Sequence, residues 1–527
     1  FSEMEKACII MPEGEVNECM ILFNFSLQCA LQLPEIKFIW RLHPAITFEM
    51  LAAKGLEISQ LPGNIYCSSE TIEADLSRSK WVLYRGSGAS IQATVRGLKP
   101  IYLSICEELC IDPIYELDYW KEIVSTSKEF INLIKKDLSP ATIASDEDYW
   151  SVIQQGYTVS PSIINFNNGG VSPSPRIVQE AVDRFNKMTN EGPSYFMWRI
   201  LDQGREPLRY KLAQLAGADP DEVAINRNST EALNTVIFGL NLKAGDEVIG
   251  TKQDYPNMIN AWRQRASREG VVYTQLNFKY PIENDEEIVN AFEKAITPKT
   301  KIFHITHVVN WVGQIMPVKK LCALAKKYGI ETIVDGAHSF GLMDFSVPDL
   351  GCDYFGASLH KFLSAPIGSG MLWIKKDKIE KIWPLICNDR PNSGDIRKFE
   401  TIGTRSFPIE QGIGEALNFH NAIGSKRKEE RIRYLKNYWA TRAQQIPKVK
   451  INTSLKDEYS CAICGVSIDG MTPGELDNAL FNEYKIHTVG IVWENISCVR
   501  ITPHVYTRIQ DLDKLVYALE RIAAKKK

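Results

Sequence analysis

Short apolar runs alternate with amphipathic segments along the first 140 residues of the chain. Four of these runs have the length of buried strands, and they cover residues 7–11, 36–42, 81–84 and 100–103. The segments between them have the character of helices. Such alternation is typical of a parallel sheet covered by helices, so we expect an α/β domain in this part of the chain.

The alternation continues from residue 146 to the C-terminus. Strands are predicted at residues 223–226, 246–250, 301–309, 332–335, 353–357, 462–468 and 498–502. Helices are predicted at residues 146–155, 208–216, 229–240, 431–445, 473–484 and 509–524. Because 527 residues exceed the usual size of one compact domain, we expect at least two domains, each with a core of its own.

The charge balance and the hydropathy exclude several classes of partner. Lys and Arg total 61 and Asp and Glu total 64, which leaves a net charge of -3. This balance indicates neither a nucleic-acid partner nor an anionic membrane surface. Since no apolar run reaches about 18 residues, we predict no transmembrane helix. The chain starts with Phe1 and shows no signal peptide, so we expect it to begin inside a longer protein.

Twelve cysteines are scattered along the sequence. In a chain of this length, that distribution indicates reduced thiols and a cytoplasmic enzyme rather than a secreted disulfide framework. The CxxC motif at Cys461–Cys464 has neither a second cysteine pair nor nearby histidines. We therefore expect these two thiols to pack in the core and predict no metal site.

An acid, an imidazole and a lysine follow two neighbouring predicted strands. Asp335 and His338 come at the end of the first strand, and Lys361 follows the second, 26 positions after Asp335. Ligands of α/β sheets bind where strands end. A carboxylate can keep a pyridine nitrogen protonated, and a lysine in a site of low polarity can react with an aldehyde. These residues predict a pyridoxal 5'-phosphate (PLP) site, with a Schiff base at Lys361, Asp335 at the ring nitrogen, and His338 stacked or at the phenolic oxygen.

Other side chains at predicted strand ends complete this site. Ser229 or Thr230 can cap a helix whose first turn offers free N–H groups to a phosphate. Further expected cofactor contacts are Ser358 and His360 at the phosphate, Tyr255 on the ring face and Asn310 at the phenolic oxygen or the substrate carboxylate.

The motifs carry a resemblance to a known family. Asn-Ser-Thr-Glu-Ala (228–232), Asp-Gly-Ala-His (335–338), Ser-Leu-His-Lys (358–361), Gly403-Thr404 and Arg500 resemble the class V aminotransferases, which are fold-type I PLP enzymes. The resemblance covers about 380 residues. Residues 148–150, 167–169 and 254–256 make the module most similar to isopenicillin N epimerase-like proteins.

The resemblance implies further roles and a domain plan. It assigns Arg500 to the substrate carboxylate and Thr404 to a loop that reaches the phosphate of a partner subunit, which implies a homodimer with shared active sites. Asn168 is expected to bound the substrate pocket. The expected plan is a linker with a helix at 141–165, a large α/β/α domain at 166–424 and a smaller α+β domain at 425–527.

The first 140 residues carry a second resemblance. Residues 41–44, 86–88 and 97–100 resemble the C-terminal, donor-binding half of a GT-B glycosyltransferase of surface-carbohydrate synthesis. This implies a Rossmann-like half-domain at 1–140. Gln92 stands near the position where many such enzymes carry an acidic ribose ligand, and the acceptor-binding half is missing. We therefore expect this half-domain to be vestigial, structural or truncated.

Three reactions are compatible with the sequence. The first is epimerase-like or aminotransferase-like chemistry at the α-carbon of a small amino acid. The second is a cysteine desulfurase or C–S lyase, but a desulfurase needs a thiolate on a mobile loop, residues 485–495 contain no cysteine, and Cys498 lies within a predicted strand. The third is a surface-carbohydrate protein whose activity resides in the glycosyltransferase-like half. We favour the first, because Arg500 points to an amino acid.

Overall fold

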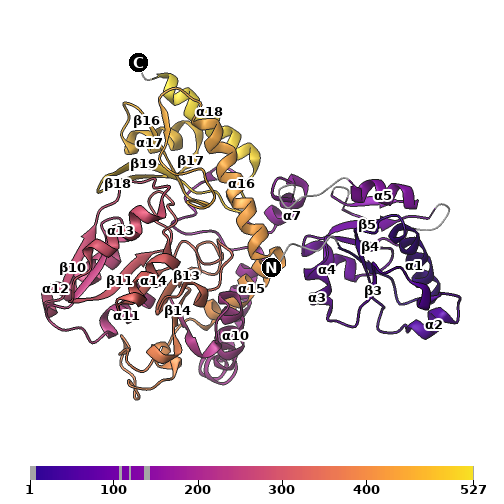
Figure 1. Cartoon of the computed structure of the whole chain (residues 1–527), viewed down its shortest axis with the longest axis horizontal. Coiled ribbons are helices and arrows are strands. Elements are labelled where there is room, and N and C mark those ends of the chain that lie inside the picture. Colours follow the sequence, from indigo (N-terminus) through magenta and orange to yellow (C-terminus); the bar gives the residue numbers. More distant parts are fainter. Residues whose placement is uncertain (1–6, 106–109, 118–119, 136–142, 526–527) are drawn as a thin grey trace. The chain divides into compact units, whose positions relative to one another are not determined.

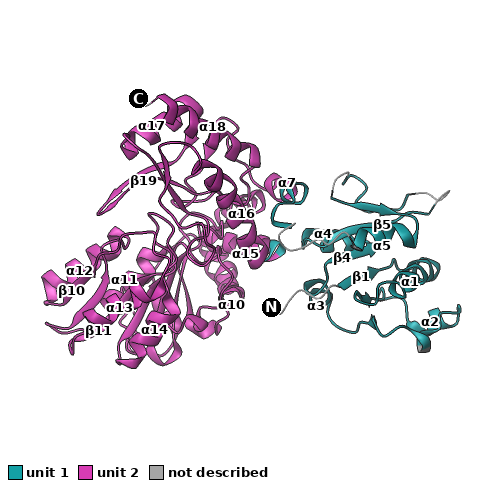
Figure 2. Cartoon of the chain, turned by 45° about the horizontal axis from the view of Figure 1, so that its top comes forward, with its two compact units in different colours: residues 1–150, 422–424 teal, residues 151–421, 425–527 magenta. Residues whose placement is uncertain are grey.

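The computed structural model describes residues 7–105, 110–117, 120–135 and 143–525. The chain forms two compact units (Figure 2). Unit 1 holds residues 1–150 and 422–424, and unit 2 holds residues 151–421 and 425–527. The boundary near residue 150 falls within helix α7 (Glu147–Gln155). No helix in the described ranges has both the length and the apolar character needed to cross a membrane.

Unit 1 is built on a six-stranded sheet with the order β3-β2-β1-β4-β5-β6, and all neighbouring strands are parallel. The strands are β1 (Ala7–Met11), β2 (Lys37–Trp40), β3 (Ile65–Cys67), β4 (Trp81–Tyr84), β5 (Lys99–Leu103) and β6 (Glu122–Val124). The helices are α1 (Val16–Ala30), α2 (Phe48–Ala52), α3 (Ile72–Ser77), α4 (Ala89–Val95) and α5 (Ser127–Lys135). This order is that of a doubly wound Rossmann sheet, and the predicted parallel α/β sheet is confirmed.

The sequence pattern found four of these strands and missed two. β1 and β4 are buried on both faces, which is why each reads as a continuous apolar run. β3 and β6 are three residues long and lie at the two edges of the sheet, where their side chains are largely half-buried or exposed. Such short edge strands carry too weak a hydropathy pattern to be recognised.

Unit 2 contains a seven-stranded sheet with the order β10-β9-β11-β12-β13-β14-β8 (Figure 1). Its strands are β8 (Val223–Asn226), β9 (Glu247–Thr251), β10 (Val272–Leu276), β11 (Thr300–Thr306), β12 (Glu331–Asp335), β13 (Tyr354–Ser358) and β14 (Gly370–Ile374). The strands from β10 to β13 are parallel, and β14 runs antiparallel to both β13 and β8.

Helices cover both faces of this sheet. They are α8 (Arg176–Glu191), α10 (Arg205–Ala216), α11 (Ser229–Gly239), α12 (Pro256–Glu269), α13 (Asp285–Ala295), α14 (Val318–Lys327) and α15 (Phe407–Ile423). The three-residue α9 (Pro193–Tyr195) follows α8 and buries no residue. Residues of α11 and α12 share one apolar core with the sheet, and residues of α10, α13 and α14 share another. Two cores on one sheet make the α/β/α layering expected from the sequence.

A smaller antiparallel sheet, with the order β15-β16-β19-β18, follows. Its strands are β15 (Val449–Ile451), β16 (Cys464–Ile468), β18 (Val489–Trp493) and β19 (Ile496–Ile501). The helices α16 (Ser425–Ala443), α17 (Pro473–Tyr484) and α18 (Ile509–Lys525) pack against it, and β17 (Ile486–His487) pairs with β7 (Ile164–Asn165).

A buried ion pair anchors the segment that precedes Thr404. Glu400, at the end of the short 3-10 helix Ile396–Glu400, accepts two hydrogen bonds from the Arg209 guanidinium, at 2.6 and 2.9 Å. The backbone N–H of Ile225 donates to the same carboxylate at 2.7 Å. Both charged side chains are buried. The pair therefore joins α10, β8 and the segment that begins at residue 401.

Replacing Arg209 with Met is expected to lower the free energy of unfolding by about 3 kcal/mol, because the buried Glu400 charge would lose its bidentate partner and keep only Arg205, whose Nη1 lies 3.3 Å away. Urea unfolding followed by tryptophan fluorescence measures the change. The control is Arg508→Met, which removes the exposed Arg508–Asp511 pair and should cost at most about 1 kcal/mol. Equal losses in the two variants would contradict the structural role of the buried pair.

Candidate active site

The helix start expected at the phosphate is built differently from the prediction. Asn228 is the capping residue, because its Oδ1 accepts from the Glu231 N–H at 2.9 Å. The prediction that Ser229 or Thr230 caps α11 was wrong. Ser229 instead joins the helix to the end of β13: its N–H donates to Ser358 Oγ at 3.0 Å, and Ser358 Oγ donates to Ser229 Oγ at 2.9 Å. Hydroxyls and helix N–H groups thus gather at one point, which suits an anion.

The acid, the imidazole and the lysine come together as expected. Asp335 ends β12 and pairs in register with Gly356 of the parallel strand β13. His338 and Lys361 follow these two strands, and Lys361 Nζ lies 2.9 Å from His338 Nε2. The same Nζ lies 6.0 Å from the centre of the Tyr255 ring, at the start of α12. The neighbouring strand ends account for this cluster.

Burial tunes the titration of this cluster. It lowers the pKa of the Lys361 amine to about 8; the nearby Asp335 charge opposes this shift and the Arg500 charge adds to it. Burial, together with the charges of Lys361 and Arg500, lowers the pKa of His338 well below its ordinary value. His338 is therefore neutral near pH 7, and about a tenth of Lys361 is a free amine at that pH, far more than for an ordinary lysine.

Asp335 is a buried carboxylate at the end of β12. Its Oδ1 accepts from the Ala337 N–H at 2.9 Å. Burial raises its pKa, and the Ala337 hydrogen bond and the Lys361 and His304 charges oppose that shift. A protonated ring nitrogen placed beside Asp335 would offset the cost of its buried charge.

Arg500 is a buried guanidinium held by neutral oxygens. Its Nη1 donates to the Asn310 carbonyl at 2.9 Å and its Nη2 donates to Asn167 Oδ1 at 2.8 Å. Burial lowers its pKa to about 10. Within the described ranges, no carboxylate lies within ion-pair distance of Arg500, and its Nε has no hydrogen-bond partner. Such a group is prepared to bind a carboxylate from outside the chain.

The two neighbouring asparagines, Asn167 and Asn168, contact different partners. The Asn168 amide is fully engaged: its Nδ2 donates to the Thr502 carbonyl at 2.8 Å, and its Oδ1 accepts from the Tyr506 hydroxyl at 2.7 Å. This side chain therefore braces the turn after β7 and is not free for a substrate, against our expectation. Asn167, which the sequence did not single out, contacts Arg500.

The remaining predicted residues lie around the same strand ends or on the surface. His360 Nδ1 lies 3.0 Å from the Ser369 carbonyl, and Asn310 is buried with no hydrogen-bond partner for its Oδ1. Thr230 is half-buried in the first turn of α11. Thr404 is exposed on its loop, and its contact with a partner subunit stays a prediction.

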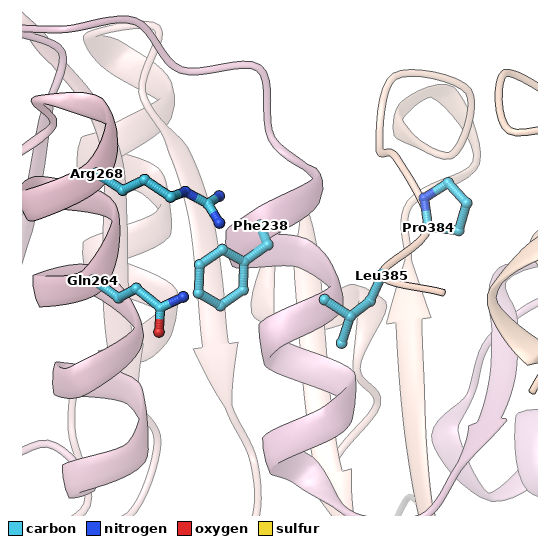
Figure 3. A pocket seen from close by; sticks show the side chains of 5 residues that line it. All are labelled: Phe238, Gln264, Arg268, Pro384 and Leu385. Atoms are coloured by element: carbon cyan, nitrogen blue, oxygen red, sulfur yellow. The ribbon is translucent and has the colours of Figure 1, made fainter. Parts of the chain in front are cut away.

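A hollow of about 280 Å³ opens elsewhere on the large sheet's helices (Figure 3). Its lining consists of Phe238, Gln264, Arg268, Pro384 and Leu385. The Arg268 guanidinium lies 5.6 Å from the centre of the Phe238 ring. None of the residues predicted for the site belongs to this lining, so the hollow is separate from the cluster around Lys361.

The cluster fits PLP on several independent grounds. The paired serines at the start of α11 suit its phosphate, and the buried Asp335 suits its ring nitrogen. The Lys361 amine, whose pKa is lowered to about 8, is partly neutral near pH 7, as reaction with an aldehyde requires. Three buried atoms lack hydrogen-bond partners that a bound ligand could supply: His338 Nδ1, Asn310 Oδ1 and Arg500 Nε.

Comparison with known proteins identifies the family. The sequence model of the family described as aminotransferase class-V matches residues 164–515. The chain belongs to the class V aminotransferase family. An isopenicillin N epimerase of Streptomyces clavuligerus is 28% identical over 390 residues, which cover 71% of this chain and 98% of that protein. A probable cysteine desulfurase of Halalkalibacterium halodurans is 28% identical over 397 residues, 70% of this chain and 95% of that protein.

A solved structure shares the fold of the class V module. It is a C-DES variant with glycine covalently linked to its PLP cofactor, and it matches with a TM-score of 0.62 and 21% identity over 68% of this chain and 97% of that one. PLP is the cofactor of this class V enzyme, as the sequence predicted. The family match starts at residue 164, so it leaves the Rossmann sheet of unit 1 outside.

The pKa of Lys361 predicts how PLP uptake depends on pH. Only the neutral amine can react with an aldehyde, and the pKa of this amine is lowered to about 8. Below pH 8 the rate of PLP uptake by the apoenzyme should therefore rise about tenfold per pH unit, and above pH 8 it should level off. Stopped-flow absorbance of the bound cofactor measures this rate. A midpoint near that of an ordinary lysine would contradict the burial of the amine.

Proposed function

We propose that the class V module acts at the α-carbon of a small amino acid, as an epimerase-like or aminotransferase-like enzyme. The observation that carries the proposal is Arg500, a buried guanidinium without a carboxylate partner in the described chain, whose charge acts on the Lys361 amine. A carboxylate held at Arg500 would place its own α-carbon close to a base. When bound, PLP withdraws electrons from the substrate α-carbon and makes its proton acidic.

Each residue of the candidate site has a role in this proposal. Arg500 binds the substrate carboxylate through two parallel hydrogen bonds, and Asn167 and Asn310 hold the guanidinium in place. Lys361 Nζ takes the α-proton and returns it, and the neutral His338 accepts a hydrogen bond from it. The assigned cofactor contacts are Asp335 at the ring nitrogen, Tyr255 on the ring face, Ser229, Thr230, Ser358 and His360 at the phosphate, and Thr404 from a partner subunit.

Desulfuration is disfavoured by the position of the thiols. Residues 485–495 include β17 and β18 and contain no cysteine. Cys498 lies within β19 with 1% of its surface exposed, and burial raises the pKa of its thiol to about 12. It is therefore neither mobile nor a thiolate. Elimination at a C–S bond needs no cysteine and is an outcome that the assay below distinguishes.

A homodimer is part of the proposal. Thr404 is exposed, and its neighbour Arg405 stacks its guanidinium 5.8 Å from the Trp198 ring, which is 41% exposed. Ile367, six residues after Lys361, is 69% exposed. Exposed apolar residues beside a loop of this kind suit a subunit interface. Sedimentation velocity should give the mass of a dimer, and a monomer with full activity would contradict the shared site.

For unit 1, the available contacts favour a structural role over donor binding. The Glu13 carboxylate packs directly against Gly86, in the turn after β4 where the GT-B resemblance would place a phosphate. A carboxylate at that point repels an anion. Isothermal titration with UDP- and GDP-sugars should therefore give no heat of binding. Tight binding of either sugar nucleotide would instead support the carbohydrate-related alternative, and a change of that binding in Glu13 variants would locate it at this turn.

One assay tests the proposed activity. The PLP-loaded enzyme is incubated with each amino acid in deuterated water, with and without pyruvate or 2-oxoglutarate. We expect α-proton exchange for at least one amino acid, accompanied by its opposite enantiomer or by a keto acid, and absent in Lys361→Ala. Sulfide release from cysteine would indicate C–S chemistry instead. A protein that takes up no PLP, or that exchanges no α-proton with any amino acid, would refute the proposal.

A further inference from the structure

A second lysine is buried next to the turn that carries Lys361. Lys428 lies in the first turn of α16, and only 2% of its surface is exposed. Its Nζ donates a hydrogen bond to the carbonyl of Phe362, the residue that follows Lys361. The same Nζ lies 3.4 Å from His420 Nδ1 of α15. In the described ranges, no carboxylate lies within ion-pair distance of Lys428.

The turn that Lys428 contacts is tight and conformationally unusual. The Ser364 N–H donates to the Lys361 carbonyl at 3.0 Å, which closes residues 361–364 into a turn. Ser364 has a φ of 60°, in the left-handed region that non-glycine residues rarely adopt. Its hydroxyl lies 3.3 Å from His504 Nε2 and 3.4 Å from the Tyr157 hydroxyl. Such a backbone persists only where its surroundings hold it.

Phe362 links this turn to the reactive cluster through its side chain. Its ring is parallel to the His504 imidazole, at 6.1 Å between centres, and lies edge to face with His338 at 6.4 Å. His338 in turn contacts Lys361 Nζ at 2.9 Å. A shift of the Phe362 carbonyl would therefore move the backbone of Lys361 on one side and the imidazole that contacts its amine on the other.

We propose that Lys428 is a positioning residue for the reaction at Lys361: its buried amine holds the Phe362 carbonyl and thereby fixes the turn from which Lys361 reaches the cofactor. This inference rests on the proposed function for its kinetic consequence only. A buried amine without an acid partner is costly, and a methionine would fill the same volume without that cost.

The electrostatics around Lys428 agree with this geometry. Burial lowers the pKa of its amine to about 7. The titratable groups that face it are His420 and His504, whose pKa values are also lowered by burial and by the Lys428 charge itself. Both imidazoles are neutral near pH 7, so the Phe362 carbonyl is the strongest acceptor that the Lys428 amine contacts.

The chain offers a matched control on the same helix. Lys436 is also fully buried in α16, and its Nζ donates to Ser460 Oγ and to the Ser454 carbonyl, away from the Lys361 turn. Lys428→Met and Lys436→Met thus remove the same groups from the same helix. A purely structural role predicts that the two substitutions lower the melting temperature alike and leave the cofactor unaffected.

The test compares the two variants with the native enzyme as PLP-loaded proteins. In Lys428→Met we expect kcat to fall by about 10- to 100-fold with little change in KM, as misplacement of a catalytic group does. We also expect a shift of at least half a pH unit in the midpoint of the bound cofactor's absorption, and slower PLP uptake. Lys436→Met should leave all three unchanged, and Lys428→Gln, which keeps a donor, should restore part of the loss.

The spectroscopic readouts need no substrate, so they decide the proposal even if no amino acid turns over. A Lys428→Met protein with the native absorption midpoint and the native rate of PLP uptake would overturn it. Equal shifts in Lys428→Met and Lys436→Met would overturn it as well. If Lys428→Met does not fold, Lys428→Ala, which also removes the donor, provides the same comparison, and a native midpoint together with native PLP uptake in that variant would refute the positioning role.

Discussion

Replacement of Lys361 with Ala is expected to abolish the near-visible absorption of bound PLP and to lower α-proton exchange by at least about 10²- to 10⁴-fold. Lys361 Nζ is the amine that lies 2.9 Å from His338 and near the Tyr255 ring, and its pKa is lowered to about 8. No other side chain in the cluster described above has an amine that is partly neutral near pH 7. Absorbance and deuterium incorporation measured by NMR report the two losses.

The control for this substitution is Lys426→Ala, at an exposed position on α16. It should keep both the absorption and the exchange. Lys361→Ala should also retain the circular dichroism of the native protein, because a small side chain at a strand end removes no core packing. An unchanged absorption band in Lys361→Ala would show that another lysine holds the cofactor.

Replacement of Arg500 with Met is expected to reduce kcat/KM by roughly 30- to 5,000-fold, which corresponds to about 2–5 kcal/mol for a buried charge that loses its partner. Arg500→Lys should rescue little, since an ammonium cannot hold the Asn310 carbonyl, Asn167 and a carboxylate in one plane. Kinetics with the amino acid and with its amide measure the effect.

The amide comparison separates a carboxylate grip from a general defect. The native enzyme should discriminate strongly against the amide, and Arg500→Met should discriminate weakly. PLP uptake near neutral pH should slow only modestly, because burial is the main cause of the lowered Lys361 pKa and the lost Arg500 charge is a smaller one. If Arg500→Met loses activity equally on the acid and the amide, the guanidinium acts on the fold and not on the substrate. Arg508→Met, at an exposed arginine, is the surface control.

Most elements of the fold were readable from local patterns. β8, β12, β13, α17 and α18 lie within about two residues of their predicted bounds, because each is a buried run or an amphipathic repeat with clear ends. The strand predicted at residues 301–309 ends at Thr306 instead. The residues beyond it leave the sheet for a loop in which the Asn310 carbonyl meets Arg500, a contact that no local pattern encodes.

Two side-chain roles were misread for the same reason. By residue type, a helix cap could be Asn228, Ser229 or Thr230. Ser229 contacts Ser358 instead, and Asn228 caps the helix. Asn167 and Asn168 are adjacent and chemically identical, yet the hydrogen bonds to Thr502 and Tyr506 engage one and leave the other to Arg500. In each case the partner lies more than 100 positions away in the chain.

The sequence by itself determined the α/β architecture, the PLP cofactor and the motifs from which the candidate site is drawn, because these depend on hydropathy, residue type and short-range spacing. Tertiary structure alone decided which groups are buried together. Three contacts show this. Arg209 and Glu400 are 191 positions apart in the chain, Arg500 and Asn310 are 190 apart, and Lys428 and Phe362 are 66 apart. Burial and proximity, which set the pKa values of these groups, arise only when the chain has folded.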